Sequence, residues 1–130
     1  MRQELLVVAV AVVLGAGCSN STSSYGGGTG GGPTCTPTAT QVCMINTSFS
    51  PANLTVPVGT MVTWLNGDSF AHYVASAMGS PGAAYTSSSV AGGSTFSHTF
   101  SAAGTYPYYC TIHGHDGTPP TGMHGTITVQ

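Results

Sequence analysis

Short runs of β-forming residues, separated by glycine, proline, asparagine and serine, follow one another from Gln41 onward, and no window carries a useful helical repeat. Seven such runs fit into about 90 residues, which is typical of two sheets packed face to face. The chain is therefore predicted to be all-β, an antiparallel Greek-key β-sandwich. The expected strands are 41–49, 53–56, 60–66, 72–76, 94–100, 105–110 and 125–129.

The N-terminus predicts export. An apolar run from Leu5 to Leu14 is too short to span a bilayer, and it leads into LGAGC, which is similar to the end of a bacterial lipoprotein signal. We expect residues 1–17 to be a signal peptide, Cys18 to carry lipid and anchor the chain to a membrane, and residues 18–34 to form a flexible Gly/Ser-rich tether. An ordinary secretory signal is the alternative. Residues 35–130 then form one domain outside the cytoplasm, in the periplasm or at the cell surface.

Charge is almost absent from the predicted mature chain. The 130 residues include one Lys or Arg and three acids, and cleavage before Cys18 would leave only Asp68 and Asp116. Without cationic side chains a protein cannot neutralise phosphates, which argues against a nucleic-acid partner. Electrostatic steering should also be weak, so partner contacts are expected to rest on apolar and uncharged polar surface.

The cysteines divide into three roles. With Cys18 assigned to lipid, Cys35 and Cys43 are close in sequence and are predicted to form a disulfide, because thiols that can pair usually do so outside the cytoplasm. Cys110 is left without a partner. Alternation in the strand 105–110 places it on the inward face, together with Tyr106 and Tyr108.

The segment PYYCTIHGHDGTPPTGMHGTITV explains this unpaired thiol. It combines one cysteine, three histidines and one methionine. A thiolate, two imidazoles and a weakly held thioether form the ligand set of a blue-copper electron-transfer site. The predicted ligands are His72 from NGDSFAHYV, Cys110, His113 and Met123. His115, at Cys-x₄-His spacing, is the alternative to His113, whereas His98 and His124 are expected to be structural or surface residues.

Two stretches resemble the cupredoxins of the plastocyanin and azurin type. FSPANLTVPVGTMVTWLNGDSFAHYV is similar to that family's first-histidine region, and GTYPYYCTIHG with GMHGTITV is similar to its closing ligand loop. The resemblance covers residues 41–130 and implies one type 1 copper ion and an apolar patch around the loop histidine. Redox donor and acceptor proteins would dock there transiently, on a rim that we expect to include Ala71, Pro119 and Pro120. We expect a monomer.

Two departures from the family are visible. The interval between His113 and Met123 is longer than in plastocyanin itself, which predicts a change in the exposed rim of the copper pocket and in the reduction potential. The residue after the first histidine is Tyr73, where plastocyanins and azurins often carry an asparagine that ties the two ligand loops together. We expect Thr111 to make that tie instead.

Other functions fit the same residues less well. Copper delivery or copper tolerance is the alternative, but a buried ion held by a thiolate would be released slowly. A zinc site is disfavoured because a thioether is an unusual zinc ligand and copper binds such sets more tightly. An enzyme with Cys110 as nucleophile and His113 as base would lack an evident acid to orient the base, and five histidines are too few for a multicopper oxidase. We therefore predict an electron carrier and no enzyme.

Overall fold

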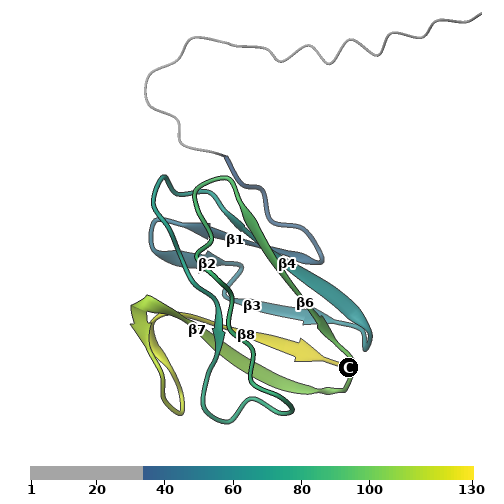
Figure 1. Ribbon diagram of the computed structural model, residues 1–130. Coiled ribbons are helices and arrows are strands. Elements are labelled where there is room, and N and C mark those ends of the chain that lie inside the picture. The colour runs from purple at the N-terminus through teal and green to yellow at the C-terminus, as the bar shows by residue number, and fades with distance from the viewer. Residues whose placement is uncertain (1–33) are drawn as a thin grey trace, which may run out of the picture.

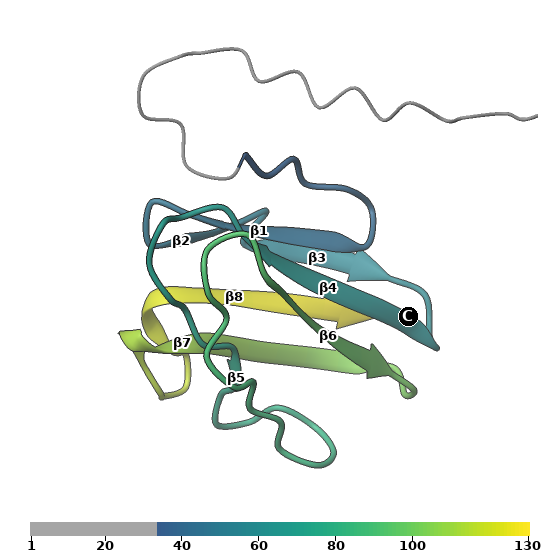
Figure 2. The same ribbon diagram turned by 45° about the horizontal axis from the view of Figure 1, so that its top comes forward.

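Residues 34–130 of the computed structural model form two stacked β-sheets (Figures 1 and 2). The first sheet has the order β2-β1-β4-β6 and the second the order β3-β8-β7-β5. The predicted signal peptide, Cys18 and all but the last residue of the tether lie outside the described residues. No helix in residues 34–130 is long and apolar enough to cross a membrane. The strands are β1 (Gln41–Ile45), β2 (Ser48–Ser50), β3 (Asn53–Val56), β4 (Thr60–Asn66), β5 (Ala75–Ser76), β6 (Thr95–Phe100), β7 (Gly104–His115) and β8 (Thr121–Val129).

The predicted all-β sandwich is confirmed, and its sheets are mixed rather than purely antiparallel. Strand β1 pairs with β4 in parallel, and β3 pairs with β8 in parallel, whereas the other pairs are antiparallel. The parallel pairs arise because the chain leaves the first sheet after β2, contributes β3 to the second sheet and then returns as β4. A connection between parallel neighbours has to cross in this way and cannot be a tight hairpin.

Four predicted strands differ from the observed ones by more than one residue, and one of them is the last, which was expected at 125–129 and begins at Thr121 as β8. The run 41–49 is interrupted by a turn at Asn46 and Thr47, and both of these residues have positive φ, 52° and 55°. Such values at two successive positions are those of the tight turns that join hairpin strands. The run 72–76 is reduced to the two residues of β5, and β7 continues five residues past Cys110 to His115.

Aromatic side chains from both sheets meet in the core. Trp64 of β4 and Tyr108 of β7 are fully buried and pack edge to face, with ring centroids 5.3 Å apart. Phe49 of β2 contacts the same Tyr108 ring at 4.7 Å. Such pairs add about 0.5–1.5 kcal/mol beyond the burial of their area. The predicted inward direction of Tyr106, Tyr108 and Cys110 is confirmed, since all three are buried.

The predicted disulfide between Cys35 and Cys43 is present. Cys43 is fully buried in β1, and its Cα lies 5.7 Å from that of Cys35 in the segment that precedes the sheet. The side-chain amide of Gln41 donates to the carbonyl oxygen of Thr36 at 3.0 Å and adds a second link across the same loop. The bond therefore fastens the N-terminal arm of the domain to the centre of the first sheet.

Replacing both cysteines, Cys35→Ser with Cys43→Ala, is expected to lower the free energy of unfolding by about 2–3 kcal/mol, because the unfolded chain then regains the freedom of the closed loop. Urea unfolding of the variant and the parent protein measures the difference. Addition of a reductant should destabilise the parent and leave the variant unchanged. If the variant equals the parent in stability, the disulfide does not constrain the fold.

Candidate metal centre

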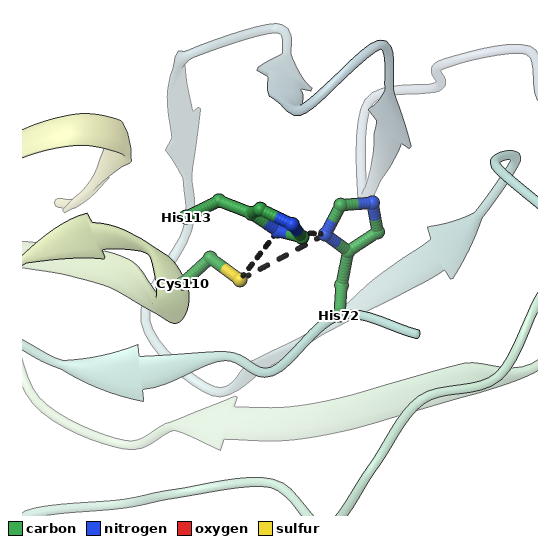
Figure 3. Close-up of side chains that lie close together, drawn as sticks. All are labelled: His72, Cys110 and His113. Carbon is green, nitrogen blue, oxygen red and sulfur yellow. Dashed lines mark hydrogen bonds between the residues drawn. The ribbon is translucent and has the colours of Figure 1, made fainter. Parts of the chain in front are cut away.

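Three of the four predicted ligands converge at one end of the sandwich. The Cys110 sulfur lies 3.8 Å from Nδ1 of His72 and 3.6 Å from Nδ1 of His113, and the two nitrogens are 3.1 Å apart. Figure 3 shows the sulfur and one nitrogen of each ring pointing toward one another. His72 and Cys110 are fully buried, whereas His113 is half-buried. The site is thus closed on one side and reaches solvent through a single imidazole.

The hairpin of β7 and β8 carries Cys110, His113 and Met123. Pairing is regular up to Tyr109, is broken by an irregularity, and resumes with Gly114 opposite Gly122. A Cβ at Gly114 would lie 2.7 Å from the carbonyl oxygen of Met123, and a Cβ at Gly122 would lie 2.7 Å from that of His113. Only residues without a side chain allow such a close approach of the two backbones. The glycines therefore let the ligand-bearing strands close on each other.

His72 reaches the same place from the connection between β4 and β5. Its backbone exchanges two hydrogen bonds with Val90, with N–O distances of 3.0 and 2.9 Å. Asn66, buried at the end of β4, donates its side-chain amide to the carbonyl oxygens of Phe70 and Val90 at 2.7 and 2.8 Å. These bonds fix the loop 66–72 without any regular strand pairing.

The other residues considered as ligands lie in three different environments. Met123 is buried and belongs to the same apolar cluster as Cys110, so its side chain lies inside the sandwich. His115, the alternative ligand, is exposed and pairs with Thr121 near the tip of the hairpin. His98 stacks on Tyr85 with ring centroids 4.2 Å apart, and burial lowers its pKa. Among the described residues, one group of three or more His, Cys, Asp or Glu side chains has its ligand atoms close enough together to hold a metal ion. Its members are His72, Cys110 and His113.

Sequence reasoning missed Asp68. This buried carboxylate accepts a hydrogen bond from Nε2 of His72 at 2.8 Å and from the backbone N–H groups of Asn46 and Thr47 at 2.8 and 3.2 Å. Burial by itself would raise the pKa of Asp68, but the N–H of Asn46, the His72 ring and the N–H of Thr47 outweigh burial and lower that pKa. The signal in the sequence was an acid four residues before a predicted ligand, in a stretch without any cation.

The link between the two ligand segments is made by the backbone. The N–H of Tyr73 points at the Cys110 sulfur at 3.5 Å, a contact that stabilises a thiolate. Thr111, which was expected to make this link, is exposed, and no side-chain hydrogen bond from it is found in the described part of the chain. The interaction needs no particular side chain at position 73, which explains why tyrosine can stand there.

The rim of the site differs in part from the prediction. Phe70 and Ile112 are about half exposed, and the Phe70 ring stands edge to face against His113 at 5.6 Å. Pro119 is exposed as expected, whereas Pro120 is buried. Phe70 and Ile112, together with the half-buried His113, form the surface that we call the apolar rim. It carries no charged side chain.

The three donor atoms suit a metal ion of the first transition series. A point equidistant from them lies about 2 Å from each, close to the usual length of a metal–nitrogen bond and slightly shorter than a metal–sulfur bond. Nδ1 of His72 faces the cluster, and Nε2 on the other side of the same ring lies 2.8 Å from Oδ2 of Asp68. Two imidazoles and one thiolate are the donor set of a blue-copper centre.

A β-sandwich with a His–Cys–His cluster at one end defines a cupredoxin. Residues 36–130 match the family of copper binding proteins described as the plastocyanin/azurin family. A plastocyanin of Scenedesmus fuscus is 35% identical over 89 residues, which cover 63% of this chain and 86% of that protein. The chain belongs to the plastocyanin/azurin family, and its cofactor is one type 1 copper ion.

Solved structures agree with this assignment. A Cu(I) structure of a methionine-to-glutamine mutant of amicyanin superposes with a TM-score of 0.60 at 32% identity, over 69% of this chain and 80% of the other. A copper-containing nitrite reductase from Thermus scotoductus gives a TM-score of 0.61 at 28% identity, over 74% of this chain. The match spans only 23% of the nitrite reductase, so the likeness is to one part of that protein.

The choice between the two loop histidines can be tested with a matched pair of variants. His113→Gly is expected to lose the normal copper spectrum and to regain it when free imidazole enters the vacated position, because His113 faces Cys110. His115→Gly should keep the spectrum, since its side chain is exposed at the hairpin tip. Absorption spectra of both copper-loaded variants, with and without imidazole, give the answer. Loss and rescue in His115→Gly would reverse the assignment.

Proposed function

We propose that the protein is a one-electron carrier whose copper ion is held by His72, Cys110 and His113, with Met123 as a weak axial ligand. The observation that carries the proposal is the buried Cys110 thiol with Nδ1 of two imidazoles within 3.8 Å. When bound, copper supplies the chemistry of a single-electron exchange between Cu(II) and Cu(I). Met123 follows Gly122 on the strand that closes the hairpin, and its buried side chain belongs to the same apolar cluster as Cys110, which supports the axial role.

The protein contributes a scaffold that resists rearrangement. Cys110, His113 and Met123 are on paired strands, and His72 is fixed through its backbone bonds to Val90 and its ring bond to Asp68. Packed, hydrogen-bonded elements of this kind hold a set of groups in place without reorganisation. Such rigidity favours electron transfer, in which ligands should keep their positions in both oxidation states. It disfavours copper delivery, which requires the ligands to open.

The order of the side chains in the site would suit an enzyme, but a substrate has no access to the Cys110 sulfur. Cys110, His72 and Asp68 follow one another as a thiol, a base and an orienting acid do in a hydrolase, with His72 rather than His113 in the place of the base. However, the side chain of Cys110 is fully buried, with 0% of its surface exposed. A substrate could not reach the sulfur without unfolding the site. We therefore propose a carrier and no enzyme.

We further propose that the domain works outside the cytoplasm, held at a membrane through lipid on Cys18 and a tether over residues 18–34. The proposal rests on the LGAGC sequence after the apolar run and on the Gly/Ser-rich composition of the tether. The disulfide between Cys35 and Cys43 supports it, because such bonds persist in oxidising compartments.

The copper assignment is tested by spectroscopy. The copper-loaded protein is expected to show an intense visible absorption band from the bond between the Cys110 thiolate and Cu(II), and the EPR signal of a blue site. Cys110→Ala should abolish the band, and its far-UV circular dichroism should remain that of the folded sandwich, since alanine fits the space of the thiol. A variant that keeps the band would exclude Cys110 as the ligand.

The apolar rim is the surface through which we propose that electrons pass. His113 is the one member of the ligand cluster that reaches solvent, and Phe70 and Ile112 flank it with exposed apolar surface. Residues 34–130 contain no Lys or Arg, and of their two acids Asp68 is buried. A partner is therefore recognised by apolar contact, with little contribution from charge.

The rate of electron self-exchange between two copies tests this route. We expect it to change by less than about twofold between low and high salt, because little charge is available to be screened. Ile112→Lys should slow the exchange at low salt and make it salt-dependent, since two like charges then meet at the rim. Val58→Lys is the matched control. Val58 is about as exposed as Ile112, but it lies just before β4, and the loop that carries His72 follows the other end of that strand. Equal effects of both variants would place the exchange elsewhere.

A further inference from the structure

Asp68 lies behind His72, on the side of the ring that faces away from Cys110 and His113. Its Oδ2 is 2.8 Å from Nε2 of His72, whereas the cluster is formed by Nδ1 of the same ring. The side chain is 9% exposed, and residues 34–130 contain no Lys or Arg that could neutralise it. A buried carboxylate without a cation is costly unless hydrogen-bond donors surround it.

The donors come from a strained turn. Asn46 and Thr47 both have positive φ, which is uncommon for residues other than glycine and especially unfavourable for a β-branched side chain. Their backbone N–H groups both point at the carboxylate, with distances of 2.8 Å to Oδ1 and 3.2 Å to Oδ2. The hairpin turn between β1 and β2 thus also presents two N–H donors to Asp68.

The backbone of Asp68 is fixed as firmly as its side chain. Its own N–H donates to Oδ1 of Asn66 at 2.8 Å, and the amide group of Asn66 holds the carbonyl oxygens of Phe70 and Val90. The carboxylate therefore cannot turn away from the His72 ring without breaking bonds in two separate segments. An acceptor held at this place fixes both the orientation of the ring and the position of its hydrogen.

We propose that Asp68 is a positioning residue that keeps a hydrogen on Nε2 of His72 and orients the ring, so that Nδ1 is free for copper before any metal is bound. The negative charge of Asp68 then remains beside the centre and favours Cu(II) over Cu(I), which lowers the reduction potential. The proposal rests on His72 being a copper ligand, as proposed above. It adds a determinant of affinity and potential that lies outside the four ligands.

The position of the hydrogen can be measured without copper. Nitrogen-15 NMR of the metal-free protein at neutral pH is expected to show His72 protonated at Nε2, and Asp68→Ala should lose this preference. A parent protein protonated at Nδ1, or an Asp68→Ala variant with the pattern of the parent, would overturn the proposal. The measurement on the parent protein decides the matter even if the variant does not fold.

The electrostatic part is tested on the copper-loaded protein. Asp68→Asn and Asp68→Ala are expected to raise the reduction potential, and Asp68→Ala should weaken Cu(II) binding by about 10–100-fold. Asp116→Asn is the matched control, because it removes the same charge from an exposed loop while its amide oxygen can still accept from Met78 and Gly117. Its shift in potential should be smaller.

The outcomes separate the two proposals. If the parent protein binds copper without the blue absorption band, the proposed electron-transfer site fails, whatever Asp68 does. If the parent is blue and the Asp68 and Asp116 variants shift the potential equally, the contact with His72 has no special effect, and only the role of Asp68 is overturned.

Discussion

The antiparallel pairing of β7 with β8 is the constraint on which the site depends. It brings Cys110, His113 and Met123 into one hairpin although nine residues lie between the last two, and it does so because Gly114 and Gly122 let the backbones approach closely. The nine residues between His113 and Met123 are taken up by the paired ends of β7 and β8 and by a loop whose Asp116 accepts from the N–H of Met78 at 2.7 Å. A longer ligand loop therefore does not mean a looser one.

A second constraint is the absence of cations. In most proteins a buried acid is paired with Lys or Arg, but in residues 34–130 that option does not exist. Asp68 is instead surrounded by N–H groups, two from the turn at Asn46 and Thr47 and one from the His72 ring. The hydrogen bond between Asp68 and His72 thus both orients the imidazole and stabilises the buried charge. Loss of any one of the three donors would leave the carboxylate less stabilised.

The fold class and the converging ligands could be predicted from the sequence because both depend on local spacing. Alternation in 105–110 predicted that Cys110 points inward, and the unpaired thiol with Cys-x-x-His predicted a metal. The parallel pairs depend on contacts between distant segments, and the bond from Asp68 to His72 depends on how the loop folds, so neither could be predicted. The turn at Asn46 and Thr47 is local, but it lacks the glycine that usually marks such a turn in a sequence. Strand β5 was overestimated because a run of β-forming residues shows no sign of the irregular connection that replaces it. The predicted Thr111 link failed since a backbone N–H took its place.

The two histidines have opposite environments, and an electron carrier needs both. His113 is half-buried under Phe70 and offers a short path to a partner, whereas His72 is sealed from solvent. On the side away from Cys110, the His72 ring contacts Asp68, whose carboxylate is held by the N–H groups of the turn between β1 and β2. That turn is far from the ligand hairpin in sequence, and β1 is also the strand that the disulfide fastens to the N-terminal arm. Correct closure of the first sheet is therefore part of building the copper site, because an open turn would leave Asp68 without donors and His72 without its fixed orientation.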